Sequence, residues 1–208
     1  MAKVYPKAPI VSPYLTLKRE SFTIWMKSLL CHSNGCTVFD SDGQIVYRVD
    51  NYDKKCRNEV YLMDLRGKVL FTIKRKKLLV FERWEGYKWS SSSTVKKEKP
   101  RFKVKKYCKY FFMGDLACKV SAGHDNYWMV RSSAGKADFK IVNNDGNIIA
   151  EANQKQSSSG ILLGEDVLTL RVEPYVDHSF IVALVTERGE EIELREKLYF
   201  IAIHITVL

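Results

Sequence analysis

Short runs of alternating apolar and polar residues, separated by turn residues, recur along most of this chain. In QIVYRVD, residues 44–50, the side chains of Ile45, Tyr47 and Val49 share one face, as in a half-buried β-strand. Gly43 ends the preceding SDG turn and can adopt the positive φ that a tight hairpin needs. The segment 36–50 is therefore predicted to be a β-hairpin.

Further runs of this kind follow, and most are bounded by glycine, proline, asparagine or serine. They cover residues 22–30, 59–78, 83–89, 100–113, 116–123, 127–133, 139–152 and 167–174. Many short strands at a spacing of roughly ten residues are typical of an antiparallel sandwich or barrel. The sequence therefore predicts a mostly β fold.

One hairpin pattern occurs twice. TVFDSDGQIVYRVD, residues 37–50, resembles FKIVNNDGNIIAEA, residues 139–152, and both have an Asp-Gly pair in the turn. Two similar halves of a closed barrel would leave such a repeat. A chance likeness is the alternative, because Asp-Gly turns are common in hairpins.

The segment 175–192 breaks the strand pattern. Residues 180–185, FIVALV, are apolar on every side, and a helix of that kind must be buried all round. Asp177 is placed to cap such a helix, whose natural position in a β protein is the middle of a barrel. A further buried strand is the alternative, since the run is short and rich in β-branched residues.

Positive charge is concentrated in one part of the chain. The net charge of the 208 residues is +10, but sixteen Lys and Arg against three Glu between Arg66 and Lys109 give a local +13. The remaining residues therefore sum to −3. A basic segment of this kind indicates a partner with negative charge, or a solvated surface.

The candidate binding residues come from two basic runs, KRKK at 74–77 and KKEKPRFKVKK at 96–106. In the second run Lys103 and Lys105 share the strand face opposite Phe102 and Val104. Six residues are predicted to form a contact face for anionic membrane lipid: Lys74, Arg75, Lys76, Lys77, Lys103 and Lys105. Nucleic acid or an acidic protein is the competing partner, and lysines that only protect strand edges are the plain alternative. KRKK also matches a short nuclear-localisation pattern, although it directly follows a strand.

No residue pattern points to catalysis, a metal or a cofactor. His124 and Asp125 are adjacent but lack a nucleophile motif, and the Asp-Gly turns lack the closing Glu of a calcium loop. The five cysteines form no CxxC pair and fit free thiols in a reducing compartment; they are Cys31, Cys36, Cys56, Cys108 and Cys118. The chain has no apolar signal region and no run long enough to span a bilayer, so we expect a soluble, cytoplasmic protein, peripheral at the membrane or nuclear in part.

Several segments together resemble the plant LURP-one-related family. They are residues 25–52, 60–78 and 173–185, ending in EPYVDHSFIVALV, and the likeness extends over about residues 20–186. The resemblance implies a fold similar to the tubby C-terminal domain and the phospholipid scramblases, an antiparallel barrel of about twelve strands around a hydrophobic helix at 177–186.

The resemblance also implies a domain division and a kind of function. It predicts an irregular lead-in at 1–20, a barrel domain at 21–186 and an atypical tail at 187–208, since the chain departs from the family pattern after Val185. It implies a non-enzymatic, monomeric protein tethered to membrane phosphoinositide and, for some members, a link to pathogen defence. No catalytic residue is carried over from the family.

Overall fold

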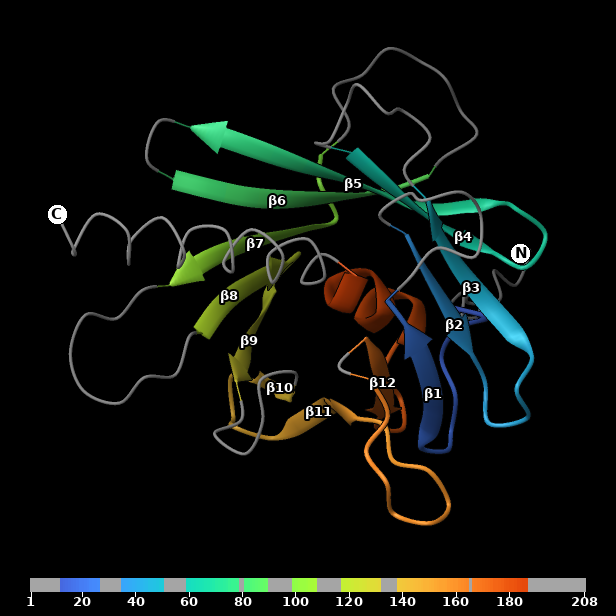
Figure 1. Ribbon diagram of the computed structural model, residues 1–208. Coiled ribbons are helices and arrows are strands. Elements are labelled where there is room, and N and C mark those ends of the chain that lie inside the picture. Colours follow the sequence, from blue (N-terminus) through green and yellow to red (C-terminus); the bar gives the residue numbers. More distant parts are fainter. Residues whose placement is uncertain are drawn as a thin grey trace, which may run out of the picture.

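The computed structural model describes residues 12–26, 35–50, 59–78, 81–89, 99–107, 117–131, 138–164 and 166–186. Within them twelve strands form one closed antiparallel barrel (Figure 1). The strands are β1 (Glu20–Trp25), β2 (Cys36–Phe39), β3 (Ile45–Asp50), β4 (Glu59–Asp64), β5 (Val69–Leu78), β6 (Phe81–Lys88), β7 (Phe102–Tyr107), β8 (Ala117–Ala122), β9 (Asp125–Arg131), β10 (Phe139–Asn143), β11 (Ile148–Gln154) and β12 (Val167–Val172). Neighbours in the chain are neighbours in the barrel, and pairing of β1 with β12 closes it.

A helix over residues 178–186 lies in the middle of the barrel (Figure 1). Residues 181–185 are at most 1% exposed, because every side of the helix faces the inner surface of the closed sheet. The carboxylate of Asp177 accepts hydrogen bonds from the backbone N–H of Ser179 and of Phe180, at 3.0 and 3.3 Å. This cap satisfies donors that the first turn of a helix leaves free. The predicted barrel and its central helix are confirmed, and the strand alternative for this segment is wrong.

The hairpin pattern found in the sequence has a local cause in turn chemistry. In the β2–β3 turn the Asp40 carboxylate accepts hydrogen bonds from two backbone N–H groups, two and four residues later. Asp64 and Asn143 do the same in the β4–β5 and β10–β11 turns. Each turn also has a glycine at positive φ, namely Gly43, Gly67 and Gly146.

The position of these hairpins corrects the prediction about barrel halves. The two copies, β2–β3 and β10–β11, are eight strands apart in the chain, whereas halves of a twelve-strand barrel are offset by six. The hairpin six strands before β10–β11 is β4–β5, which has Gly67 in its turn. The likeness of residues 37–50 and 139–152 therefore reflects a shared turn type and not equivalent places in two halves.

The described part of the N-terminal lead-in packs against the start of the helix. Leu15 forms an isolated antiparallel bridge with Asp177, and the Ser12 hydroxyl donates to the Asp177 carboxylate over 3.0 Å. The backbone N–H of His178 donates to the Tyr14 carbonyl over 2.9 Å. Residues 12–16 thus hold the helix entrance in place. The predicted tail at 187–208 lies outside the described residues.

Candidate functional site: a row of cations across four strands

The outer surface of β5, β6, β7 and β8 carries a row of basic residues. Backbone pairing places Lys76 opposite Arg83, Arg83 opposite Lys105, and Lys105 opposite Lys119. Directly opposite residues in an antiparallel pair lie on the same face of the sheet. The cation row is therefore one line of four positive charges, which spans about 14 Å at the usual distance between strands.

Period-2 alternation places this row on the outside of the barrel. Phe102 and Val104 on β7 are buried, at 0% and 3% exposure, while Lys103 and Lys105 between and after them are exposed. On β6 the Trp84 side chain is buried and Gly86 lies opposite the buried Phe102, so Arg83 faces outward with Lys105. The predicted alternation of residues 102–105 is confirmed.

The row contains little compensating negative charge. Arg83 forms an ion pair with Glu85, with Nε and Oε1 3.0 Å apart. The Lys119 ammonium lies 5.8 Å from the ring centroid of Trp128, which is its cross-strand neighbour on β9. Among the described residues, no carboxylate lies within ion-pair distance of Lys76 or Lys105. Like charges directly opposite each other destabilise a sheet, so an anionic partner would relieve this arrangement.

The neighbouring row on the same face is balanced. It runs from Glu59 through Lys74 and Glu85 to Lys103, so its charges alternate in sign. Lys74 is ion-paired with Glu59 over 3.1 Å. Lys74 is thus held by a carboxylate, and Lys103 is the exposed cation that adjoins the cation row.

Tyrosine hydroxyls position the two carboxylates of this balanced row. Tyr61 donates a hydrogen bond to Glu59 over 3.0 Å, and Tyr87 donates to Glu85 over 2.6 Å. Burial and the bond to Glu85 raise the pKa of Tyr87 to about 12. The Tyr87 hydroxyl therefore remains a donor at physiological pH and keeps Glu85 beside Arg83.

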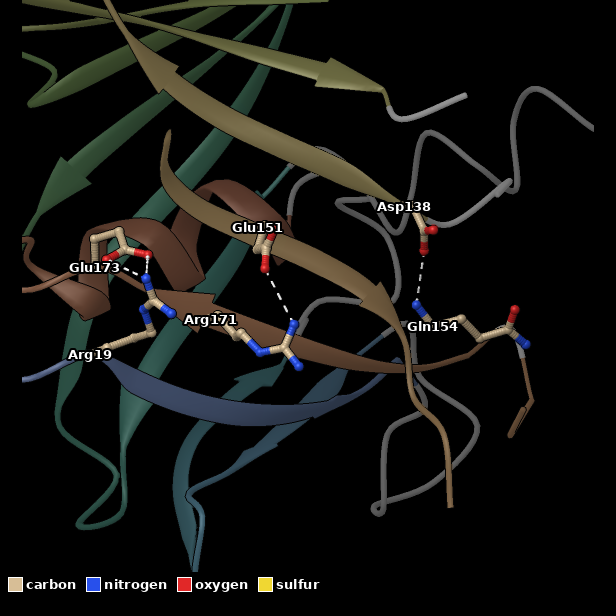
Figure 2. A network of polar contacts seen from close by, with 6 residues as sticks. All are labelled: Arg19, Asp138, Glu151, Gln154, Arg171 and Glu173. Carbon is tan, nitrogen blue, oxygen red and sulfur yellow. Dashed lines mark hydrogen bonds and ion pairs between the residues drawn. The ribbon is translucent and has the colours of Figure 1, made fainter. Parts of the chain in front are cut away.

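The opposite side of the barrel provides a contrast, which Figure 2 shows. There Arg171 on β12 lies directly opposite Glu151 on β11, and their side chains form an ion pair at 3.2 Å. Arg19 forms an ion pair with Glu173 at 2.9 Å, and the Asp138 carboxylate accepts a hydrogen bond from the backbone N–H of Gln154 (Figure 2). These two cations are paired with acids, whereas the four residues of the cation row oppose other cations.

The six residues predicted from the sequence do not all meet. The structure brings together Lys76, Lys103 and Lys105, with Lys74 beside them in its ion pair. Arg75 lies opposite the buried Trp84, with its guanidinium carbon 5.6 Å from the indole centroid. The backbone of Lys77 pairs with that of Glu82. All of residues 74–77 lie in the hydrogen-bonded β5–β6 ladder, and not in an extended free peptide.

Two members of the row, Arg83 and Lys119, were missed by the sequence analysis. Arg83 was counted among the charges between Arg66 and Lys109 but was not included in the predicted contact face. Lys119 lies outside that segment. The signal that could have found them is the strand register, which requires knowing that β5 to β8 pair in chain order.

The other candidate groups have ordinary structural roles. Burial, and then the nearby Asp50, raise the pKa of the Cys36 thiol to about 12, so this thiol is unreactive at physiological pH. His124 lies in the exposed turn between β8 and β9. In the part of the chain that the structure describes, no three His, Cys, Asp or Glu residues gather into a metal-binding group. Among the described residues, no helix is both long and apolar enough to cross a membrane.

Comparison with known proteins agrees with the fold and the motifs. The model of the LURP-one-related family matches residues 20–187. The chain belongs to the LURP-one-related family. The LURP-one-related protein 4 of Arabidopsis thaliana is 49% identical over 190 residues, which cover 91% of this chain and 86% of the relative.

Further relatives and one solved structure support the family assignment and the fold. LURP-one-related protein 11 of Arabidopsis thaliana is also 49% identical, covering 84% of this chain and 78% of the relative. A crystal structure of another Arabidopsis thaliana protein superposes with a TM-score of 0.61 at 15% identity, covering 90% of this chain and 99% of that one. At this identity the likeness shows the fold alone.

Proposed function

We propose that this LURP-one-related chain is a non-enzymatic binding protein that attaches to anionic membrane lipid through its cation row. The observation that carries the proposal is the direct opposition of Lys76, Arg83, Lys105 and Lys119 on four adjacent strands. A lysine or arginine near an anionic bilayer contributes about 1 kcal/mol of binding free energy. The row and Lys103 together place five cations on one face, of which Arg83 is ion-paired with Glu85.

The main alternative is that these lysines only protect strand edges from aggregation. Lys103 and Lys105 do not need that role, because β7 is paired with β6 on one side and with β8 on the other at both positions. Edge protection is needed where a strand lacks a neighbour. Only Lys76 fits it, since the described β4–β5 pairing ends at Glu59 and Lys74.

The pattern of paired charges also favours a functional surface. Cations on β12 and before β1 are neutralised by acids of the same protein, so the chain has the means to balance its surface charge. Among the described residues of β5–β8, Lys74 and Arg83 have such an acid within ion-pair distance, and Lys76, Lys103 and Lys105 do not. Exposed ion pairs add little to stability, so the fold does not depend on acids beside these lysines, which leaves them available to a ligand.

The proposal is tested by co-sedimentation of the whole chain with vesicles at physiological salt. Three vesicle types are compared: phosphatidylcholine alone, phosphatidylserine in phosphatidylcholine, and a phosphoinositide in phosphatidylcholine at the same total charge. We expect binding to both anionic types and none to the neutral type. Stronger binding to the phosphoinositide at matched charge would indicate a specific headgroup.

The competing ligand, nucleic acid, is separated in a parallel titration. For a short DNA duplex or a single-stranded RNA, the logarithm of the association constant would fall linearly with the logarithm of the salt concentration. Binding to nucleic acid without binding to anionic vesicles would overturn the lipid proposal. The link to pathogen defence implied by the family resemblance stays a prediction.

A further inference from the structure

A cavity of about 570 Å³ opens at the end of the barrel where the central helix begins. Its size falls in the range of about 300–1,000 Å³ that is usual for small-molecule sites. The apolar part of its lining includes Phe71, Tyr127, Ile149 and Phe180. Phe71 is buried, and the rings of Tyr127 and Phe180 pack with their centroids 5.8 Å apart. The cavity therefore has an apolar and largely aromatic floor.

Charged residues of both signs stand at the polar rim of this cavity. Lys88 at the end of β6 and Arg101 just before β7 contribute positive charge, and Asp125 at the start of β9 and Asp145 in the β10–β11 turn contribute negative charge. Lys88 lies opposite the inward-facing Phe71, which directs it over the barrel opening. No carboxylate of the described residues is within ion-pair distance of Lys88 or Arg101.

The electrostatic surroundings of Tyr127 connect the rim to the floor. The pKa of Tyr127 is raised first by burial and then by Asp125, while Arg101 acts in the opposite direction. The charges of Asp125 and Arg101 therefore both act on the Tyr127 hydroxyl at the cavity wall, although the two residues form no ion pair with each other. Asp177 also lines the cavity, but its carboxylate already accepts hydrogen bonds from the Ser179 backbone N–H and from the Ser12 hydroxyl.

Tyr175 gives an independent sign of function at the same place. Its φ is 63°, and it is the only described residue other than glycine with positive φ. Such a conformation costs a non-glycine residue about 1–3 kcal/mol. Burial of the ring does not offset this cost, because Tyr175 is 70% exposed. The backbone is held there by the Tyr175 N–H, which donates to the Thr16 carbonyl over 2.8 Å, and the residue lines the cavity.

We infer that this cavity is a binding site for a small apolar organic acid that also carries a hydrogen-bond donor. The apolar body of the ligand packs against Phe180 and Tyr127. Its acidic group pairs with Arg101 and Lys88, and its donor reaches Asp125. The exposed ring of Tyr175 covers the bound ligand. This site is separate from the cation row and does not depend on the proposed lipid binding.

The test uses 8-anilinonaphthalene-1-sulfonate as the probe, because it combines an aromatic body, an anionic group and an N–H donor. Its fluorescence is titrated with the whole chain and with three variants, Tyr175→Gly, Arg101→Gln and Ile161→Ala. Glycine accepts a positive φ without strain, so Tyr175→Gly removes the ring without lowering the melting temperature. Ile161 is 66% exposed and does not line the cavity, so its variant is the control.

We expect saturable binding at one site of the native protein. Tyr175→Gly and Arg101→Gln should each weaken it about tenfold, which corresponds to about 1.4 kcal/mol, while Ile161→Ala binds as the native protein does. Equal affinity in all four proteins, or equal losses in the control, would overturn the inference. Absence of saturable binding to the native protein would overturn it as well. Arg101→Gln keeps the test decisive if the glycine variant fails to fold.

Discussion

The hydroxyl oxygen of Tyr47 lies 2.6 Å from Nδ1 of His178 and so joins strand β3 to the first residue of the central helix. Tyr47 is 2% exposed, and the rings of Tyr14 and Phe22 lie with centroids 5.8 and 5.3 Å from that of His178. Loss of this contact inside an aromatic cluster would leave a buried polar group without a partner, which is costly. The pair therefore fixes how the helix enters the barrel.

Replacing Tyr47 by phenylalanine should destabilise the fold. The change leaves the ring in place but removes the hydroxyl partner of His178, so we expect the free energy of unfolding to fall by about 1–2 kcal/mol. Denaturant unfolding measures this difference. Tyr175→Phe is the matched control, because the Tyr175 side chain is exposed and its hydroxyl should contribute nothing. Equal stability of the Tyr47 variant and the native chain would show that the contact is dispensable.

The pH dependence of stability follows from His178. Burial lowers its pKa below 6.5, against the opposing effects of Asp177 and Glu20; its other neighbours, Tyr14 and Tyr47, are neutral in this range because burial raises both of their pKa values. Below pH 6.5 the unfolded chain therefore binds more protons at this residue than the folded chain does. The contribution to stability is complete above that pH and is lost as the pH falls through the folded pKa.

The measurement for His178 is the free energy of unfolding between pH 7.5 and 5.0 for the native chain and for His178→Gln. We expect the native chain to lose stability on acidification more steeply than the variant, since glutamine does not titrate. The difference between the two slopes isolates His178 from other groups. Parallel slopes would mean that His178 titrates alike in the folded and unfolded states.

Gly86 should tolerate no side chain. It lies opposite Phe102 in the β6–β7 ladder, and a Cβ atom at this position would overlap the Phe102 ring. That ring is fully buried and packs against Phe71 and Phe180, with centroids 5.8 and 5.5 Å away. An added side chain would therefore force this ring to shift.

We therefore expect Gly86→Ala to lower the free energy of unfolding by about 2–3 kcal/mol, as overpacked cores do. Gly43→Ala provides the comparison, because a side chain there meets only open space and the sole cost is its φ of 78°. That cost should be about 1 kcal/mol. If Gly86→Ala were no more destabilising than Gly43→Ala in denaturant unfolding, the close approach of Phe102 would not be a constraint.

Local sequence patterns predicted the strands better than their partners. The alternation of Phe102, Lys103, Val104 and Lys105 identified which side chains face water, because the side-chain period of a strand is two. The same rule divides the run at 74–77, which the sequence analysis treated as one cluster. It places Lys76 in the cation row and Arg75 beside Trp84.

Features that depend on long-range pairing could not be obtained from local pattern. The run 180–185 fitted a helix or a strand equally well from its residues alone, and the family resemblance decided for the helix. The physical reason is visible in the structure: the twelve-strand barrel is closed, so an inner segment has no free strand to pair with and must satisfy its own backbone. The register that joins Arg83 to Lys105 and Lys119 is likewise a property of the assembled sheet.

The measurement that tests the lipid proposal most directly compares two double charge reversals on the same anionic vesicles. Lys76→Glu with Lys105→Glu alters the cation row, and Lys18→Glu with Lys68→Glu makes the same change of net charge at exposed positions away from it. We predict that the first pair weakens co-sedimentation at least about tenfold, while the second pair stays close to the native chain. Equal losses in the two double variants would mean that only net charge matters, and would contradict a binding surface on β5–β8.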